Sequence, residues 1–213
     1  MLDILYEDNH IIVCIKPRGI LSQADSSDKN DMLTILKEYI KEKYNKPGNV
    51  YLGLVHRLDI NTKGIMVFAR TSKAASRLSS EIEKHEFIKK YIATVEGMLT
   101  NTDYVTLTNY IKKDEKTKKS FVSNDGSYAE LSYRALKNYK IDNTNVTDIE
   151  VILKTGRFHQ IRCQMSNIGY PLYGDFKYGS KIHRENFYIP LTAYYLEFVH
   201  PVTKEILKFE IKE

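Results

Sequence analysis

The stretch from His56 to Gly64 places a single carboxylate, Asp59, between a basic pair and a turn-forming segment. A second stretch, from Gly156 to Arg162, lies about a hundred residues downstream and carries cationic side chains. A carboxylate in a dry cleft needs such partners in order to stay ionised at neutral pH. The two stretches together predict one active site in which Asp59 is the catalytic carboxylate.

A calcium-binding loop and a plain turn are the alternatives for the first stretch. Residues 59–64 imitate the start of a calcium loop, but Lys63 occupies the fifth ligand position and Arg70 stands where a bidentate Glu is required. The calcium interpretation therefore fails. Asp59 and Asn61 are also common turn-forming residues before a strand, and the local sequence alone favours that structural interpretation.

The second stretch also has a structural interpretation, because Arg157 and Arg162 near the start of a helix need only be solvated. Elsewhere in the chain no glycine-rich phosphate loop follows a strand, and the six histidines show no zincin spacing. The sequence therefore supports neither a nucleotide cofactor nor a metal, and we expect no cofactor.

The composition is that of a globular protein with a moderate basic bias. The 213 residues are 42% hydrophobic and 28% charged, with a net charge of +5, which favours a polyanionic partner. No linker divides the chain, so we expect a single domain over residues 1–213. The N-terminus has no signal-peptide pattern, and no apolar run could span a bilayer, so we expect a cytoplasmic protein without a membrane partner. Cys14 and Cys163 are expected as separate buried thiols.

A lysine-rich run between two expected strands extends from Lys112 to Lys119 and carries five lysines against two acids. One interpretation is a solvated hairpin tip. The other is a mobile finger that contacts phosphates, which would make binding fall with salt. Both remain open, and the candidate contacts are Lys112, Lys113, Lys118 and Lys119.

Hydrophobic periodicity predicts an α+β domain. An amphipathic helix is expected over Asp31 to Tyr44, with an N-cap at Asn30 or Asp31 and a stop at Pro47-Gly48. Further helices are expected over 72–85 and 158–168. The expected strands are 3–6, 10–15, 65–69, 91–95, 104–107, 129–133, 147–153, 191–199 and 206–211. Consecutive strands without intervening helices predict a large mixed, mainly antiparallel sheet flanked by helices.

Taken in order, these pieces resemble the RluA-type pseudouridine synthases, which isomerise uridine in structured RNA. The match covers four separate motifs and nearly the whole chain. The first motif runs from Ile4 to Gly19 and the second from His56 to Gly64, and the third includes Lys89, Tyr91 and Gly97. The fourth motif has the most fixed spacings and consists of residues 156–162, Gly169, Pro171-Leu172, Gly174-Asp175 and Tyr178-Gly179, with residues 200–203 fitting the closing strands.

The resemblance implies a pseudouridine synthase fold and an RNA isomerase that needs no cofactor. It implies that Asp59 is the essential carboxylate, either as the nucleophile at C1′ or as the base that removes a ribose proton. Arg162 matches the arginine that pairs with this aspartate, and Tyr91 matches a tyrosine that stacks on the uracil. Arg57 matches the residue inserted near the flipped-out base. The further RNA-binding residues in this interpretation are Lys16, His56, Lys89, Arg157 and His159.

Two positions depart from the family pattern, because many relatives carry Ser at Lys63 and His at Gln164. These departures affect substrate details and not the reaction class. The chain also starts directly at the catalytic domain, so we expect it to lack the small N-terminal RNA-binding module of many relatives. We expect a monomer that acts on ribosomal or transfer RNA. The alternatives are a catalytically silent RNA-binding or RNA-folding module and a base-releasing enzyme that admits water to C1′.

Overall fold

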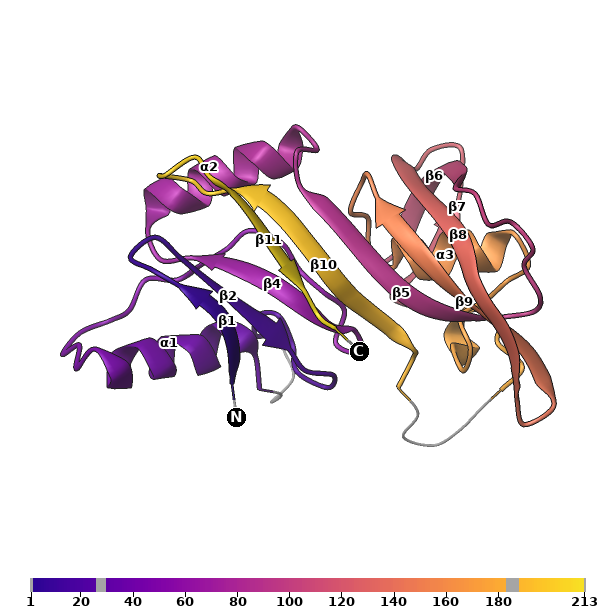
Figure 1. Cartoon of the computed structure of the whole chain (residues 1–213), viewed down its shortest axis with the longest axis horizontal. Coiled ribbons are helices and arrows are strands. Elements are labelled where there is room, and N and C mark those ends of the chain that lie inside the picture. The colour runs from indigo at the N-terminus through magenta and orange to yellow at the C-terminus, as the bar shows by residue number, and fades with distance from the viewer. Residues whose placement is uncertain (1, 26–29, 183–187, 213) are drawn as a thin grey trace. The chain divides into compact units, whose positions relative to one another are not determined.

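A computed structural model describes residues 2–25, 30–182 and 188–212. Over these residues the chain forms eleven strands and three α-helices (Figure 1). It divides into two compact units: the first unit comprises Met1–Phe87 and Ala193–Glu213, and the second comprises Ile88–Thr192. Each unit has its own sheet strands and its own functional motif. The described helices are all too short or too polar to cross a membrane.

The first unit is built on antiparallel strands. Its hydrogen-bonded order is β1-β2-β4-β10, with β3 also paired to β4 and β11 also paired to β10. The strands are β1 (Asp3–Glu7), β2 (Ile11–Lys16), β3 (Gly53–Leu54), β4 (Lys63–Ala69), β10 (Leu191–Val199) and β11 (Ile206–Glu210), and the helices are α1 (Met32–Lys43) and α2 (Ser72–Glu83). In this order β2 and β4 are inner strands, each lying between two other strands.

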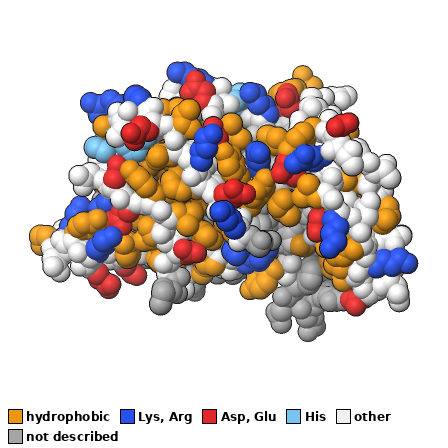
Figure 2. Space-filling view, in the orientation of Figure 1, with side chains coloured by type: hydrophobic (Ala, Val, Ile, Leu, Met, Phe, Trp, Pro, Cys, Tyr) orange, Lys and Arg blue, Asp and Glu red, His pale blue; other side chains and the backbone are white. Residues whose placement is uncertain are grey.

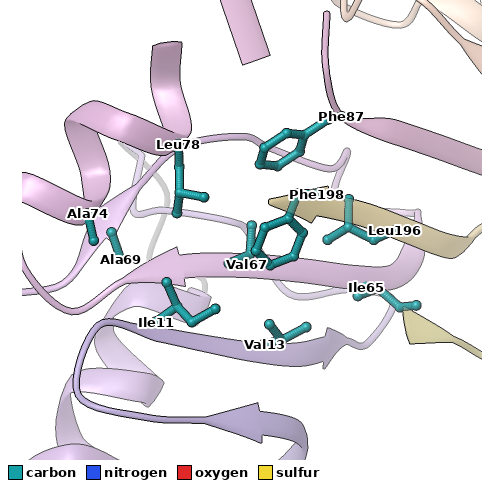
Figure 3. Packing of buried hydrophobic residues seen from close by; sticks show 10 residues of the cluster. All are labelled: Ile11, Val13, Ile65, Val67, Ala69, Ala74, Leu78, Phe87, Leu196 and Phe198. Atoms are coloured by element: carbon teal, nitrogen blue, oxygen red, sulfur yellow. The ribbon is translucent and has the colours of Figure 1, made fainter. Parts of the chain in front are cut away.

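One apolar cluster joins α2 to the central strands of the first unit. Side chains two residues apart on a strand point to the same face of the sheet. Ile11 and Val13 of β2 are spaced in this way, as are Ile65 and Val67 of β4, and the register puts all four on one side. Leu78 of α2 packs onto them, as Figure 3 shows. All five are 0 to 2% exposed, and burying each such side chain contributes about 1.5 to 3 kcal/mol.

Both helices of the first unit begin at a side-chain cap. Asp31 accepts a hydrogen bond from the Thr34 backbone N–H at 3.1 Å, and Thr71 accepts one from Ala74 N–H, also at 3.1 Å. The Asp31 cap confirms one of the two N-caps that the sequence predicts. α1 ends at Lys43, before the predicted stop at Pro47-Gly48.

The second unit is built on antiparallel strands in the order β5-β9-β8-β6-β7. These strands are β5 (Ile88–Glu96), β6 (Val105–Asp114), β7 (Lys119–Val122), β8 (Ser127–Ile141) and β9 (Thr144–Leu153). The helix α3 (Gln160–Asn167) and the 3-10 turn η1 (Phe176–Tyr178) pack on one face of them. Ile111, Ala129, Cys163 and Tyr178 form the apolar contact between these layers.

The α+β class and the mainly antiparallel pairing are confirmed. The run from Lys112 to Lys119 does lie at the tip of a hairpin, since Asp114 pairs with Lys119. Both cysteines are free and buried. α3 is shorter than predicted and begins at Gln160, and the short strands β3 and β7 have no counterpart in the prediction. The single domain over residues 1–213 stays a prediction.

Candidate active site

Asp59 lies in a closed turn just before β4 in the first unit. The Thr62 N–H donates to the Asp59 carbonyl at 3.0 Å, and the Gly19 N–H donates to the Ile60 carbonyl at 2.8 Å. The first hydrogen bond closes the turn, and the second ties it to the loop after β2. The Asp59 side chain is half-buried. The backbone that carries this carboxylate is therefore fixed from two sides.

Lys16 holds the turn in place through hydrogen bonds from its ammonium group. Its ammonium donates to the carbonyls of Pro17, Ile20 and Ile60 at 3.0, 2.7 and 3.2 Å, so all three donors are used within the protein. Burial lowers the pKa of Lys16 to about 8, although the charge of the nearby Asp59 carboxylate opposes this shift. This arrangement disfavours the direct RNA contact expected for Lys16. The geometry instead gives Lys16 a structural role in holding the turn that carries Asp59.

The residues that precede Asp59 are tied to neighbouring segments. Ser22 Oγ donates to the Leu58 carbonyl at 2.8 Å and accepts from the Leu58 N–H at 3.1 Å. His56 Nε2 accepts from the Val67 N–H at 3.0 Å, which fixes a neutral ring with its proton on Nδ1. His56 is thereby tied to β4. Arg57, which lies between His56 and Leu58 in the chain, is exposed and available to a large ligand.

A close approach of two strands follows the turn. A Cβ added to Gly64 would stand 2.4 Å from both the Cβ and the carbonyl oxygen of Ala193, which no side chain tolerates. Gly64 also has a positive φ of 153°. The glycine of the second motif is therefore required by packing between β4 and β10.

Tyr91 and Lys89 lie two residues apart on β5 in the second unit, so they share one face of the sheet. Tyr91 stands opposite Val151 and is 7% exposed. The Lys89 ammonium lies 3.8 Å from where a Cβ on Gly156 would stand, and burial lowers the Lys89 pKa. The third motif and the start of the fourth therefore meet within this unit.

Arg162 forms a buried ion pair with Asp175. Its Nε donates to Asp175 Oδ2 at 2.6 Å and its Nη2 donates to Asp175 Oδ1 at 2.8 Å. The two side chains are 7% and 1% exposed. Sequence reasoning did not assign a role to Asp175, although the residue belongs to the fourth motif. The available signal was an acidic residue after Gly174 in a segment rich in turn-forming residues.

His159 connects this ion pair to Tyr178. Arg162 Nη1 can only donate, so His159 Nε2 accepts from it at 2.9 Å, and the ring proton sits on Nδ1, which is 2.9 Å from Tyr178 Oη. Burial, helped by the charges of Arg162, Lys177 and Lys113, lowers the pKa of His159 to about 3. His159 therefore stays neutral at physiological pH, and any contact it makes with RNA is not a cationic one.

Two glutamines hold the loop before α3. Gln160 Oε1 accepts from the Arg157 N–H and from Thr155 Oγ1, both at 2.9 Å, and Gln160 Nε2 donates to Gln164 Oε1 at 3.0 Å. Gln164 Nε2 donates in turn to Asn109 Oδ1 at 2.8 Å. Gln164 has no exposed surface, so its departure from the family pattern lies in the packing of α3 on β6.

The lysines of the hairpin tip mostly face acidic partners. Lys112 pairs with Asp125, and Glu115 accepts from Lys113 at 2.8 Å and from Lys118 at 2.9 Å. These pairs are exposed, and such pairs contribute about 0 to 1 kcal/mol, so a phosphate can displace the carboxylate. Figure 2 shows the same mixture of basic and acidic side chains over the visible face of the molecule.

The structure thus assembles two groups, each within one unit. Asp59, Lys16, His56 and Arg57 belong to the first unit. Tyr91, Lys89, Arg157, His159 and Arg162 belong to the second unit, together with the four lysines of the hairpin. Among residues 2–25, 30–182 and 188–212, no three His, Cys, Asp or Glu side chains gather closely enough to hold a metal ion.

Comparison with known proteins identifies the family. Residues 10–167 match the family model described as RNA pseudouridylate synthase. The chain is 33% identical to an uncharacterized RNA pseudouridine synthase, YlyB, of Bacillus subtilis, over 98% of this chain and 68% of the relative. It is also 33% identical to the ribosomal large subunit pseudouridine synthase D of Pseudomonas aeruginosa, over 98% of this chain and 67% of that relative.

Solved structures agree at the level of the fold. The human RNA pseudouridylate synthase domain containing 1 matches with a TM-score of 0.78 and 21% identity, over all of this chain and 84% of the human one. The chain therefore belongs to the RNA pseudouridine synthases, and the resemblance to the RluA type is confirmed. It is an isomerase that acts on RNA.

Proposed function

We propose that this protein converts specific uridines of ribosomal RNA into pseudouridine, with Asp59 as the catalytic carboxylate. In this reaction the C1′–N1 bond breaks, the uracil turns over, and a C1′–C5 bond forms. The proton of C5 leaves, and N1 gains one, so the net change is an isomerisation without a redox partner. The name of the Pseudomonas aeruginosa relative as a ribosomal large subunit enzyme supports ribosomal over transfer RNA.

The observation that carries the proposal is the position of Asp59 within the family match. It is the acidic residue of the second motif, and it lies in a turn fixed by two backbone hydrogen bonds. Its charge acts on the buried Lys16, whose ammonium holds the same turn. A carboxylate held in this way can attack C1′ or remove a ribose proton without first reorganising.

Tyr91 and Arg162 complete the proposed catalytic set. Tyr91 serves as the surface on which the uracil stacks, and Arg162 keeps Asp59 ionised. Asp175 and His159 position the Arg162 guanidinium, because both bond directly to it. Arg57, Lys89 and Arg157 contact the RNA backbone around the target. We also propose that the protein works as a cytoplasmic monomer.

The test is pseudouridine mapping on large-subunit ribosomal RNA transcribed without modifications. We expect the wild-type protein to convert one or a few uridines and Asp59→Asn to convert none, while RNA affinity changes by less than about threefold because phosphates and stacking dominate binding. Free uracil in the wild-type reaction would identify a base-releasing enzyme. Binding without conversion of any ribosomal or transfer RNA would identify a silent RNA-binding module.

A further inference from the structure

Three aromatic rings stand exposed on the outer face of the strands β8, β6 and β7, which are neighbours in that order. Tyr110 of β6 is 53% exposed, Phe121 of β7 is 43% exposed, and Tyr128 of β8 is 42% exposed. Single exposed aromatic residues are ordinary on a protein surface, but a group of them on one sheet face marks a contact surface. We refer to these three residues as the aromatic platform.

The strand register places the three rings on one side of the sheet. Tyr110 stands directly opposite Tyr128, with ring centroids 6.0 Å apart at an angle of 71°. Phe121 stands opposite Lys112, which is two residues beyond Tyr110 on the same strand and so shares its face. Ile111, between them, points the other way into the core. The platform is therefore built by the sheet and does not depend on a loop.

Cations border the platform at two ends. Lys112 stands opposite Phe121 in the register, and its side chain is 49% exposed. Arg157 is exposed and donates from Nε to the Tyr128 carbonyl at 2.8 Å. Two carboxylates share this surface, because Asp125 pairs with Lys112 and Glu130 accepts from the Tyr128 hydroxyl. Rings between two cations suit a ligand that has both flat faces and negative charges.

We propose that the aromatic platform binds a single-stranded segment of the RNA substrate on the sheet face opposite to Tyr91, with bases stacked on Tyr110, Phe121 and Tyr128. The proposal rests on the proposed function in taking RNA as the substrate. Exposed rings bind unpaired bases, whereas bases in a duplex are already stacked on each other and offer no free face. Lys112 and Arg157 then neutralise phosphates at the two ends of the stacked segment.

The platform also lies on the reverse side of the layer that holds α3. Ile111 and Ala129, neighbours of Tyr110 and Tyr128 in the chain, pack against Cys163 and Tyr178 on the inner side. Arg157 belongs to the fourth motif and touches β8 directly. One short sheet segment thus carries a family motif on one side and the platform on the other, so RNA held by Arg157 can reach both.

The test measures RNA binding alone, in an Asp59→Asn background, so that it does not depend on turnover. The probe is a fluorescein-labelled single strand of about ten uridines, a length within the range of known single-strand sites. We expect Tyr110→Ser and Phe121→Ser each to weaken binding at least fivefold, since stacking contributes strongly per base. Tyr110→Phe keeps the ring and should bind like the parent. Tyr51→Ser removes a ring that is 50% exposed in the first unit and should also leave binding unchanged.

The salt dependence gives a second readout. The ring substitutions remove no charge, so the slope of log affinity against log salt should stay the same while the affinity falls. Affinity within twofold of the parent for Tyr110→Ser and Phe121→Ser would overturn the proposal. So would a parent protein that sediments as a dimer and ring variants that sediment as monomers, because a second copy would then cover the face. If the wild-type protein converts no uridine while the ring substitutions still weaken RNA binding, only the proposed reaction is overturned.

Discussion

Arg162 and Asp175 form a two-point ion pair inside the second unit, and this pair fixes the plane of the guanidinium. Three of the five N–H donors of Arg162 go to Asp175 and His159. An arginine held in this way loses little conformational freedom when it meets another anion. The arginine of the fourth motif is thus positioned by the carboxylate of Asp175, 13 residues further along the chain.

We expect Asp175→Ala to lower the free energy of unfolding by about 3 to 5 kcal/mol, because it leaves a buried guanidinium without its partner. The double variant Arg162→Met/Asp175→Ala should be more stable than the sum of the single effects predicts. Urea unfolding of the four proteins in this cycle measures both quantities. A loss below about 1 kcal/mol would mean that the pair behaves like an exposed one.

The neutral state of His159 predicts a specific dependence of stability on pH. The pKa of His159 is about 3 in the folded protein, and an unfolded histidine has a pKa of about 6.5. Below pH 6.5 the unfolded chain therefore takes up a proton that the folded one does not, and stability falls as the pH falls. Above pH 6.5 this residue has no such effect.

The matched variant is His159→Asn, since Asn does not titrate and tolerates the left-handed backbone at φ 51°. Between pH 7 and pH 5 we expect the wild-type protein to lose about 1 to 2 kcal/mol more than this variant, at a limiting slope of about 1.4 kcal/mol per pH unit. Parallel pH profiles of the two proteins would contradict the assignment of a neutral His159.

The sequence predicted the elements that depend on local patterns. The helix capped at Asp31 and the strand Leu191–Val199 follow from side-chain periodicity and cap chemistry, which neighbouring residues determine. Lys16 shows the limit of this reasoning. A lysine at the end of a strand indicates a solvated or RNA-binding residue, yet here its ammonium meets three carbonyls, one of them 44 residues away. Only the packed fold brings such partners together.

The candidate site shows the same division. The motif spacing singled out Asp59 and Arg162, because both lie in stretches of unusual composition. It gave no role to Asp175, whose contact with Arg162 depends on the turn before η1. Gln160 also escaped, since an uncharged amide carries no clear sequence signal, although its hydrogen bonds hold the loop before α3. Gln164 was singled out only as a departure from the family pattern.

The hairpin lysines should contribute to RNA binding through charge. Replacing Lys112, Lys113, Lys118 and Lys119 by Ser should weaken binding and flatten its salt dependence, because fewer counterions are released. The converse test is Glu115→Gln, which frees two of these lysines from their ion pairs and should strengthen RNA binding at low salt. Fluorescence titrations with labelled RNA between about 50 and 200 mM salt measure both effects.

A matched control for the hairpin is Lys37→Ser/Lys41→Ser on α1, compared with Lys112→Ser/Lys118→Ser. Both double variants remove two charges from exposed positions, so they change the net charge equally. We expect only the hairpin variant to change the salt slope, by about 1 to 2 in units of phosphate contacts. Equal slopes for the two variants would assign the lysine run to a solvated tip.

Gly64 links the packing of the first unit to the position of Asp59. A methyl group at this residue would overlap the backbone of Ala193, so Gly64→Ala must push β4 away from β10 or distort the turn that precedes it. Such overpacking typically costs about 1 to 3 kcal/mol. A shift of about 1 Å in the carboxylate of Asp59 would lower the rate of conversion on the order of a hundredfold. We therefore expect Gly64→Ala to lower both the unfolding free energy and kcat.

The control is Gly48→Ala, where an added Cβ meets nothing within 4 Å, and which should change stability by less than about 0.5 kcal/mol. Unfolding and single-turnover rates measured on both variants separate these effects, and a fully active Gly64→Ala would show that the strand contact does not determine where Asp59 lies.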